Sequence, residues 1–447
     1  MPINLKNKRT LIPCDVVTQR IEASGMACIG NASIRELVRL VTEIEQDAGI
    51  PFIRMEMGVP GLEPEEVGTR AEIAALKSGV AAKYVAVEGL PELKTEISRF
   101  AKLFLNIDQN PTCCIPSVGS MQGSYAAFMV ACRREKGKDT ALFIDPGFPA
   151  QKQQMQVQGL RYESFDVYAY RGEKLRGKLE QYLQKGNINT IIYSNPNNPT
   201  WLCFSDIELR IIGELADRYG TVVIEDLAYF AMDFRTDYSV PGVPPYQPTV
   251  AHYTDNYVLL ISASKTFSYA GQRIGMILVS DKLFHSRFAD LETYFSSTGF
   301  GSALIYGSLY TLTSGTAHSA QYALKAILKA ANDGEFNLTN RIKIYSETAR
   351  KIKKILVDNG FSIVYDQDEG KPLADGFYFT ASYPGLSGAE LVESLLYYGI
   401  SAISLEICGS ERKEGIRICV SQIKPELLGE IERRVQCFHR DHSRSSS

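Results

Sequence analysis

The sequence has no uninterrupted apolar run of about 18 residues, the length that a membrane-spanning helix requires. It also has no excess of positive charge, because 48 Lys and Arg residues stand against 51 Asp and Glu residues, for a formal net charge of -3. Electrostatic binding to nucleic acid or to an anionic membrane therefore has no basis in the composition. We expect neither a nucleic acid nor a membrane as a partner.

Histidine and cysteine offer little for a metal centre or a disulfide framework. The chain has five His and nine Cys, an odd number, and Cys113 and Cys114 are adjacent. Cys437, His439 and His442 lie in a polar tail without a fourth ligand, so we expect a frayed end and no bound metal. This cysteine usage, with an N-terminus that lacks an apolar signal region, favours a reducing, cytoplasmic location.

The sequence otherwise has the composition of an ordinary globular protein. Its 447 residues are 45% hydrophobic and 22% charged, which allows a sizeable core. At roughly 150 residues per domain, two or three domains are expected. Short apolar runs alternate with amphipathic stretches such as 205–220, the runs being 141–145, 190–194, 221–226, 257–262 and 276–280. This alternation predicts an α/β fold with a mainly parallel sheet flanked by helices on both faces.

The two ends of the chain depart from this alternation. Residues 16–48 have helical periodicity, and residues 318–358 have the pattern of one long helix. Residues 360–436 mix strand-like and helical runs, which is typical of a smaller α+β domain. We therefore expect a large domain of residues 59–318 and a small domain of residues 1–58 and 335–447, joined by the long helix.

Chemically capable side chains follow three of the apolar runs, and ligands in such folds bind beyond the carboxyl ends of the strands. A lysine there can lose its proton and act as a Schiff-base nucleophile. A carboxylate can keep a pyridine nitrogen protonated, and an arginine with hydroxyl groups can bind a phosphate. Together these groups predict a site for pyridoxal 5'-phosphate. The residues are Asn195, Asp226, Tyr229, Ser262, Lys265 and Arg273.

Seven stretches of sequence support this interpretation because they occur together and in one order. They are KYVAVEGLPELKTEI, SVGSMQG, DPGFPA, YSNPNNPT, EDLAYF, SASKTFSYAGQRIG and EGIRICVS. On these stretches the chain resembles the fold-type I pyridoxal phosphate-dependent aminotransferases of class I/II over nearly its whole length. The resemblance implies a PLP-dependent transferase fold with a seven-stranded sheet and an enzyme of amino acid metabolism.

The resemblance also implies a role for each residue of the cofactor site. Lys265 would form the Schiff base and carry the Cα proton of the substrate, and Asp226 would pair with the pyridine nitrogen. Tyr229 and Asn195 would hydrogen-bond the 3-oxygen of the ring, and Phe148 would stack on the ring. The phosphate would be bound by the remaining residues, which are Ser120 and Met121 at a helix N-terminus, Ser262, Arg273 and, from a second subunit, Tyr84.

The substrate site is implied in the same way. Arg417 matches the arginine that binds the α-carboxylate, Gly58 matches a glycine that passes close to it, and Asn195 lies beside the substrate as well. The expected partners are an α-amino acid, a 2-oxo acid and a second copy of the chain. Because Tyr84 would reach the neighbouring subunit, the resemblance implies a homodimer with shared active sites.

Two departures from the family pattern affect the substrate. Trp201, the one tryptophan of the chain, replaces the usual glycine after NPNNPT, so we expect a different turn with the indole near the site entrance. Residues 293–303 contain no arginine, although dicarboxylate-specific relatives use one in roughly this region. This favours a donor without a second carboxylate.

Three functions remain open from the sequence. The first is a pyridoxal phosphate-dependent aminotransferase that moves an amino group between an α-amino acid and a 2-oxo acid. The second keeps the cofactor and scaffold but is a β-lyase, decarboxylase or synthase. The third is a non-catalytic ligand-sensing domain, for which the sequence provides no basic DNA-binding segment.

Overall fold

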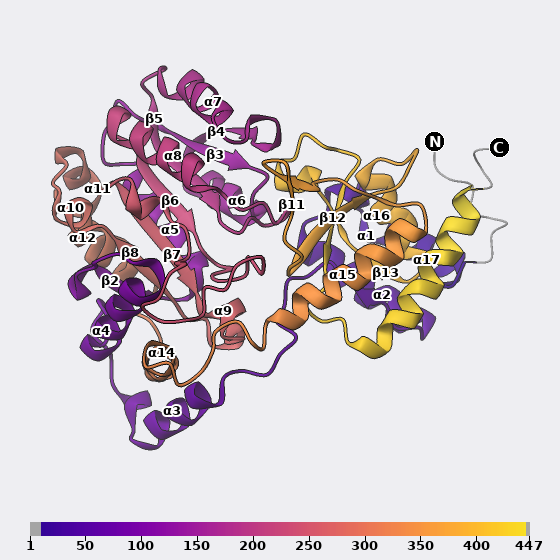
Figure 1. Cartoon of the computed structure of the whole chain (residues 1–447), viewed down its shortest axis with the longest axis horizontal. Helices are drawn as coiled ribbons and strands as arrows, with labels where there is room; N and C mark the ends of the chain where they lie inside the picture. The colour runs from indigo at the N-terminus through magenta and orange to yellow at the C-terminus, as the bar shows by residue number, and fades with distance from the viewer. Residues whose placement is uncertain (1–9, 444–447) are drawn as a thin grey trace. The chain divides into compact units, whose positions relative to one another are not determined.

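The computed structural model describes residues 10–443 (Figure 1). The chain divides into two compact units. The large unit comprises Leu62–Asn197 and Cys203–Ile342, and the small unit comprises Met1–Gly61, Asn198–Leu202 and Lys343–Ser447. The segment Asn198–Leu202, which interrupts the large unit in the sequence, therefore belongs to the small one.

The large unit is built on a seven-stranded sheet in the order β2-β8-β7-β6-β5-β3-β4. Strands β4, β3, β5, β6 and β7 run parallel, whereas β8 is antiparallel to both of its neighbours. The predicted α/β fold with a mainly parallel sheet is confirmed. The strands are β2 (Cys114–Ser117), β3 (Thr140–Asp145), β4 (Arg161–Asp166), β5 (Ile188–Ser194), β6 (Val222–Asp226), β7 (Tyr257–Ser262) and β8 (Gly275–Val279).

Helices bury the strands, since every residue of β3, β5, β6, β7 and β8 is buried. Helix α5 packs on β7 and β8, and α8 packs on β6. A capping box of Ser205 and Glu208 starts α8, and Gly220 in the left-handed region ends it. The main helices are α3 (Glu66–Lys77), α4 (Pro91–Phe100), α5 (Gly119–Ala131), α6 (Pro149–Val157), α7 (Lys174–Leu183), α8 (Asp206–Tyr219) and α14 (His318–Asn332).

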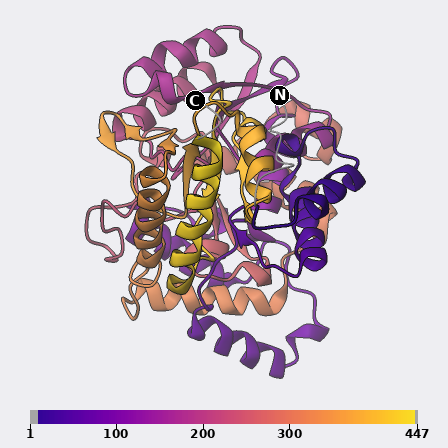
Figure 2. The same cartoon turned by 90° about the vertical axis from the view of Figure 1, so that its right-hand side faces the viewer.

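Short helical segments complete the large unit. Helix α14 packs against α3 and α4, and Figures 1 and 2 both show α3 beside α14. The short segments are α9 (Ala263–Thr266), α10 (Asp281–His285), α11 (Glu292–Phe295), α12 (Phe300–Ser302), the π-helical η9 (Ala303–Leu309) and α13 (Tyr310–Thr313).

The small unit joins both ends of the chain around one apolar core. Strand β1 (Ile53–Arg54) pairs in parallel with β13 (Ile400–Ser401), and a four-stranded sheet has the order β14-β15-β12-β9. Its strands are β9 (Ser362–Ile363), β12 (Tyr378–Ser382), β14 (Ile403–Ser404) and β15 (Ile416–Cys419), and a separate hairpin pairs β10 (Gln367–Asp368) with β11 (Lys371–Pro372). The helices are α1 (Cys14–Ser24), α2 (Ile34–Ala48), α15 (Lys343–Asp358), α16 (Gly388–Leu396) and α17 (Leu428–Ser443).

The prediction of one long helix over 318–358 is wrong, because α14 and α15 are separate helices. Gly334 has a φ of 72°, and the side-chain oxygen of Asn337 accepts hydrogen bonds from the backbone N–H groups of Thr339 and Asn340. Such local side-chain bonds offer the backbone an alternative to the helix, so the segment between α14 and α15 turns.

The prediction of a frayed tail is also wrong as far as Ser443, which ends α17. The His442 ring stacks on the Phe438 ring with their centroids 4.0 Å apart, and His439 Nδ1 lies 2.9 Å from the hydroxyl of Tyr383. The rest of the tail, 444–447, lies outside the described residues. Within residues 10–443, no helix combines the length and the apolar character that crossing a bilayer requires.

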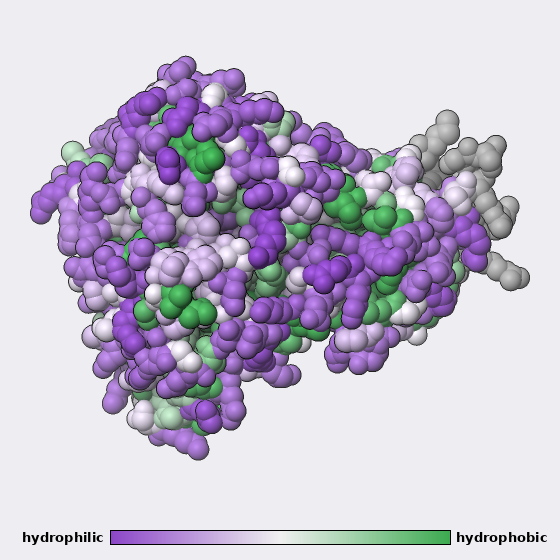
Figure 3. All heavy atoms as spheres, viewed as in Figure 1, coloured by the Kyte–Doolittle hydropathy of each residue, from purple (hydrophilic) through white to green (hydrophobic). Residues whose placement is uncertain are grey.

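Polar residues cover most of the face in view, and hydrophobic residues occur on it in small groups (Figure 3). This is the ordinary surface of a globular protein.

Candidate active site

The predicted cofactor residues of the large unit meet at the carboxyl ends of adjacent strands. Asn195 follows β5, Asp226 ends β6, and Lys265 lies in the single turn α9 directly after β7. In the sheet, Asp226 stands opposite Ser194 on one side and Leu260 on the other. The backbone N–H of Asn195 donates to the carbonyl of Asp226 at 3.0 Å. The strand ends therefore bring an amide, a carboxyl group and an amine to one edge of the sheet.

Asp226 is a buried carboxyl group with neutral hydrogen-bond donors. Gln151 Nε2 donates to its Oδ2 at 2.9 Å, and the backbone N–H of Ala228 donates to its Oδ1 at 3.1 Å. Burial raises the pKa of Asp226 to about 6, against the lowering effect of these two bonds. A cation placed against this carboxylate would offset the cost of its burial. Sequence reasoning missed Gln151, whose one signal is its position early in the helix after DPGFPA.

The side-chain amide of Asn195 is fixed by two further contacts. Its Oδ1 accepts a hydrogen bond from the backbone N–H of Phe204 at 3.2 Å, and its Nδ2 donates to Glu225 Oε1 at 3.4 Å. Glu225 is fully buried and also accepts hydrogen bonds from the Thr249 hydroxyl at 2.6 Å and the Val250 N–H at 3.0 Å. Burial raises the pKa of Glu225 to about 7. The orientation of the amide is thus defined, with its N–H side toward Glu225.

Five residues, here called the α5 cluster, come together where α5 begins: Gly119, Ser120, Ser262, Arg273 and Gly275. A Cβ atom on Gly119, whose φ is 66°, would lie 2.8 Å from Arg273 Nη2. A Cβ on Gly275 would lie 3.2 Å from the backbone nitrogen of Ser120, and Gly275 stands opposite Ser262 in the sheet. Gly119 therefore lets the Arg273 guanidinium lie against the N-terminus of α5, whose first N–H groups have no intrahelical acceptor. The Ser262 hydroxyl accepts a hydrogen bond from the backbone N–H of Ser264 at 3.1 Å.

The other predicted residues of the large unit differ in burial. Tyr229 is 4% exposed, Lys265 and Phe148 are half-buried, and Phe148 directly precedes α6. Met121 lies in the first turn of α5, where its carbonyl accepts a hydrogen bond from Gln154 at 2.8 Å. Tyr84 is 96% exposed.

Arg417 lies in the small unit and is 1% exposed in β15. Its Nη2 donates to the carbonyl of Glu56 at 2.5 Å, and its Nη1 donates to Asn198 Oδ1 at 3.1 Å. The centre of its guanidinium lies 4.3 Å from the centroid of the Tyr378 ring. A Cβ on Gly58 would lie 1.7 Å from the Tyr378 hydroxyl, so glycine is needed there. Gly58 and Arg417 therefore meet through Tyr378, which sequence reasoning missed.

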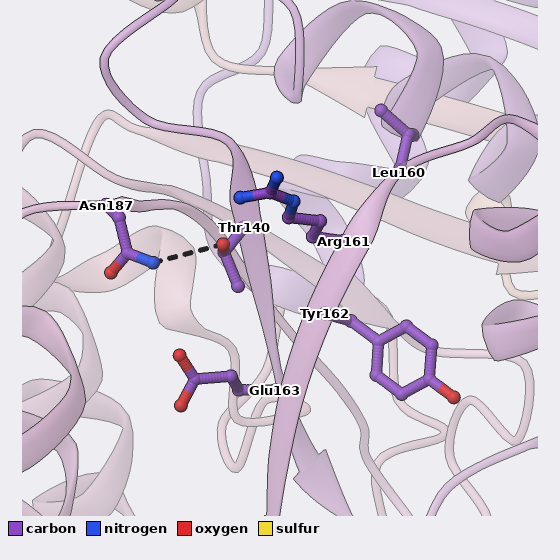
Figure 4. Close-up of a pocket in the computed structure, with 6 residues that line it drawn as sticks. All are labelled: Thr140, Leu160, Arg161, Tyr162, Glu163 and Asn187. Atoms are coloured by element: carbon purple, nitrogen blue, oxygen red, sulfur yellow. Dashed lines mark hydrogen bonds between the residues drawn. The ribbon is translucent and has the colours of Figure 1, made fainter.

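The pocket in Figure 4 lies away from these residues. It has a volume of about 430 Å³ and is lined by residues at the amino ends of β3, β4 and β5. Figure 4 shows Asn187 reaching Thr140, with Nδ2 and Oγ1 3.1 Å apart, and shows Tyr162 and Glu163 pointing away from each other on β4. Because cofactors bind beyond the carboxyl ends of such strands, this pocket is separate from the candidate site. Its lining is Thr140, Leu160, Arg161, Tyr162, Glu163 and Asn187.

Comparison with known proteins identifies the family. A model of the family described as aminotransferase class I and II matches residues 52–435. The chain belongs to this family. The resemblance seen in the sequence is thus confirmed.

Individual relatives are distant. A probable aspartate aminotransferase of Methanocaldococcus jannaschii is 25% identical over 252 residues, which cover 56% of this chain and 61% of that protein. An LL-diaminopimelate aminotransferase of Natranaerobius thermophilus is 24% identical over 401 residues, covering 88% and 94% of the two chains. In the M. jannaschii protein and an aspartate aminotransferase of Pyrococcus horikoshii, the match spans 61% and 63% of the relative's length.

Solved structures share the fold. An aspartate aminotransferase from Thermotoga maritima superposes with a TM-score of 0.73 at 18% identity, covering 94% of this chain and 99% of that one. One from Thermus thermophilus with maleate gives a TM-score of 0.72 at 15% identity, covering 94% and 98%. At these identities the likeness establishes the PLP-dependent transferase fold.

Proposed function

We propose that the protein is a pyridoxal phosphate-dependent aminotransferase that moves an amino group between an α-amino acid and a 2-oxo acid. The observation that carries the proposal is the pairing of buried Asp226, held by neutral donors, with Lys265 at the end of the adjacent strand. Family membership supports the same reaction. The relatives act on different amino acids by their names, so the proposal names only the class of substrate.

The residues present fit the cofactor. Asp226 suits a protonated ring nitrogen, because a cation would stabilise its buried carboxylate. The α5 cluster suits a phosphate, because it joins a helix N-terminus to a guanidinium. Lys265 supplies the amine. It follows β7, and in the sheet β7 lies between β6, which ends in Asp226, and β8, which begins with Gly275 of the α5 cluster. When bound, the cofactor supplies an electron sink for the bond that breaks at the substrate Cα.

Each side chain then has a defined task. The Lys265 amine takes the proton from the substrate Cα and returns it elsewhere on the reacting group, as a general base and acid. With the cofactor bound, Asp226 would keep the ring nitrogen protonated, and Asn195 and Tyr229 would hydrogen-bond the 3-oxygen of the ring. Phe148, directly before α6, would stack on the ring face.

The substrate carboxylate binds to Arg417. Its guanidinium is held at two nitrogens by Glu56 and Asn198, which fixes the plane in which a carboxylate binds. Gly58 makes room for the Tyr378 hydroxyl, since any side chain at this position would collide with it. The lack of arginine in residues 293–303 favours donors without a second carboxylate.

A homodimer is part of the proposal. Tyr84 is 96% exposed, and Tyr306, Tyr310 and Leu312 on η9 and α13 are 57%, 54% and 37% exposed. A second hollow of about 270 Å³ beside α5 is lined mainly by apolar surface, including Met121 and Tyr125. Leu312 lines this hollow, and exposed aromatic residues together with an apolar hollow are typical of a surface that a second copy covers.

Replacement of Lys265 tests the reaction. Lys265→Ala should abolish transamination and the visible absorbance of the bound cofactor, because no other amine would replace it. Lys282→Ala, which removes an exposed lysine of α10, should change neither. Transamination by Lys265→Ala at the wild-type rate would refute the assignment. Release of pyruvate and ammonia from cysteine-type substrates without an oxo acid would instead favour the β-lyase alternative.

A further inference from the structure

Trp201 is a bulky residue held where the backbone favours glycine. It is the one tryptophan of the chain, its φ is 67°, and it is 1% exposed, so the expectation of an indole near the site entrance is wrong. A Cβ on Gly376 would lie 2.0 Å from Cε2 of the indole, so the backbone of the small unit is pressed against the ring. Bulky residues rarely adopt this left-handed conformation, so a tryptophan held in it indicates a specific structural or functional role.

The indole contacts a ring that in turn contacts Arg417. Trp201 and Tyr378 meet edge to face, with ring centroids 6.1 Å apart and an interplanar angle of 72°. The guanidinium of Arg417 lies over the same Tyr378 ring, with its central carbon 4.3 Å from the ring centroid. Gly58 limits movement of the Tyr378 hydroxyl from a third direction. The three side chains therefore form one stack in the small unit, with Arg417 at its end.

We propose that Trp201 is a positioning residue for carboxylate recognition: its indole fixes the Tyr378 ring, which orients the Arg417 guanidinium toward the substrate. The inference rests on the proposed function, in which Arg417 binds the α-carboxylate. A guanidinium stacked on an aromatic ring keeps its plane, and it then loses less freedom when it binds a carboxylate bidentately. The amino acid and the 2-oxo acid both have an α-carboxylate, so Trp201 affects the affinity of the enzyme for both substrates.

The stack also makes carboxylate binding visible. Because Trp201 is the single tryptophan among 24 tyrosines, its emission, excited at wavelengths that tyrosine does not absorb, reports this stack alone. We expect saturable change in its emission when 3-phenylpropionate, a carboxylate that cannot be transaminated, is added to the holoenzyme. Arg417→Ala should remove the change.

The test compares Trp201→Gly and Trp201→Phe with the wild-type holoenzyme. Trp201→Gly should raise KM for the amino acid and the oxo acid, and the inhibition constant of 3-phenylpropionate, by about tenfold, with kcat altered by less than about threefold. Trp201→Phe, which keeps an aromatic edge, should recover most of the affinity. Phe361→Leu, a buried aromatic of the same unit outside the stack, should leave KM unchanged.

The outcomes separate the inference from the proposed function. If Arg417→Ala leaves KM and inhibitor binding unchanged, the proposed role of Arg417 fails. If Arg417→Ala weakens binding but Trp201→Gly retains wild-type KM and inhibitor affinity, the inference is overturned. Should Trp201→Gly not fold, Tyr378→Leu replaces it, with the same rise in KM expected and an unchanged KM again overturning the inference.

Discussion

The large and small units assemble their candidate functional groups in different ways. In the large unit, Asn195, Asp226 and Lys265 lie at the ends of adjacent parallel strands, so the sheet itself places them. In the small unit, Arg417 is surrounded by Glu56, Asn198 and Tyr378, which come from separate parts of the sequence. The contrast shows that secondary structure positions the first group, and side-chain packing positions the second.

The largest effect is expected at Asp226, which the sheet of the large unit positions. Asp226→Ala should lower kcat by at least about 100-fold, because a buried charge that stabilises the reacting group is lost. Glu214→Ala, which removes an exposed carboxylate of α8, is the matched control and should retain wild-type turnover. Steady-state kinetics measures both. Wild-type kcat in Asp226→Ala would show that this carboxylate has no part in the reaction.

The next largest effect is expected at Arg417, which side-chain packing positions in the small unit. Arg417→Lys should raise KM for both substrates by roughly 30-fold or more, because a weakened buried charge pair costs about 2 kcal/mol or more. Arg434→Lys changes another buried arginine of the small unit, which donates to the carbonyls of Gly399 and Pro51 at 2.7 and 3.0 Å. That control should lower stability and leave KM unchanged. Equal effects of the two substitutions on KM would contradict the assigned role of Arg417.

A smaller effect is expected from the neighbour of Asp226. Gln151→Met removes the hydrogen bond to Oδ2 and should weaken cofactor binding roughly tenfold or more, since a bond to a charged group contributes about 1.5–3 kcal/mol. Loss of the bond should also raise the pKa of Asp226 further. Equilibrium titration of the cofactor-free protein measures the affinity, with exposed Gln153→Met as control. Identical affinities in the two variants would exclude Gln151 from the site.

The smallest effect concerns stability without cofactor. Burial raises the pKa of Glu225 from 4.5 to about 7, so the folded state binds this proton more tightly than the unfolded state. The free energy of unfolding therefore falls as pH rises across this range, by on the order of 1–3 kcal/mol from this group. Glu225→Gln should make the fall shallower, as urea denaturation at several pH values would measure. A slope equal to that of Glu214→Gln would contradict the assignment.

The same contrast explains what the sequence could predict. Alternating apolar runs predicted the sheet, and the residues after each run predicted Asn195, Asp226 and Lys265, because strand ends meet at one edge. Gly58 and Arg417 were predicted through family resemblance. The turn that separates α14 from α15 was missed, because its side-chain hydrogen bonds from Asn337 compete with a strong helical pattern.

Residues that depend on packing were the hardest to predict. Tyr378 occupies an ordinary strand position, and only the structure shows its ring against Arg417. Gln151 sits in a helix whose sequence does not distinguish it from Gln153 or Gln154. The departure at Trp201 was visible, yet its burial against Gly376 was not, because the two positions are 175 residues apart in the chain.

Borohydride reduction of the cofactor-loaded protein, followed by peptide mass spectrometry, tests the central claim most directly. Reduction converts a Schiff base into a stable secondary amine and marks the lysine that carries the cofactor. One modified peptide is expected, with the pyridoxyl group on Lys265. A modification on another lysine, or none on Lys265 in protein that binds the cofactor, would contradict it.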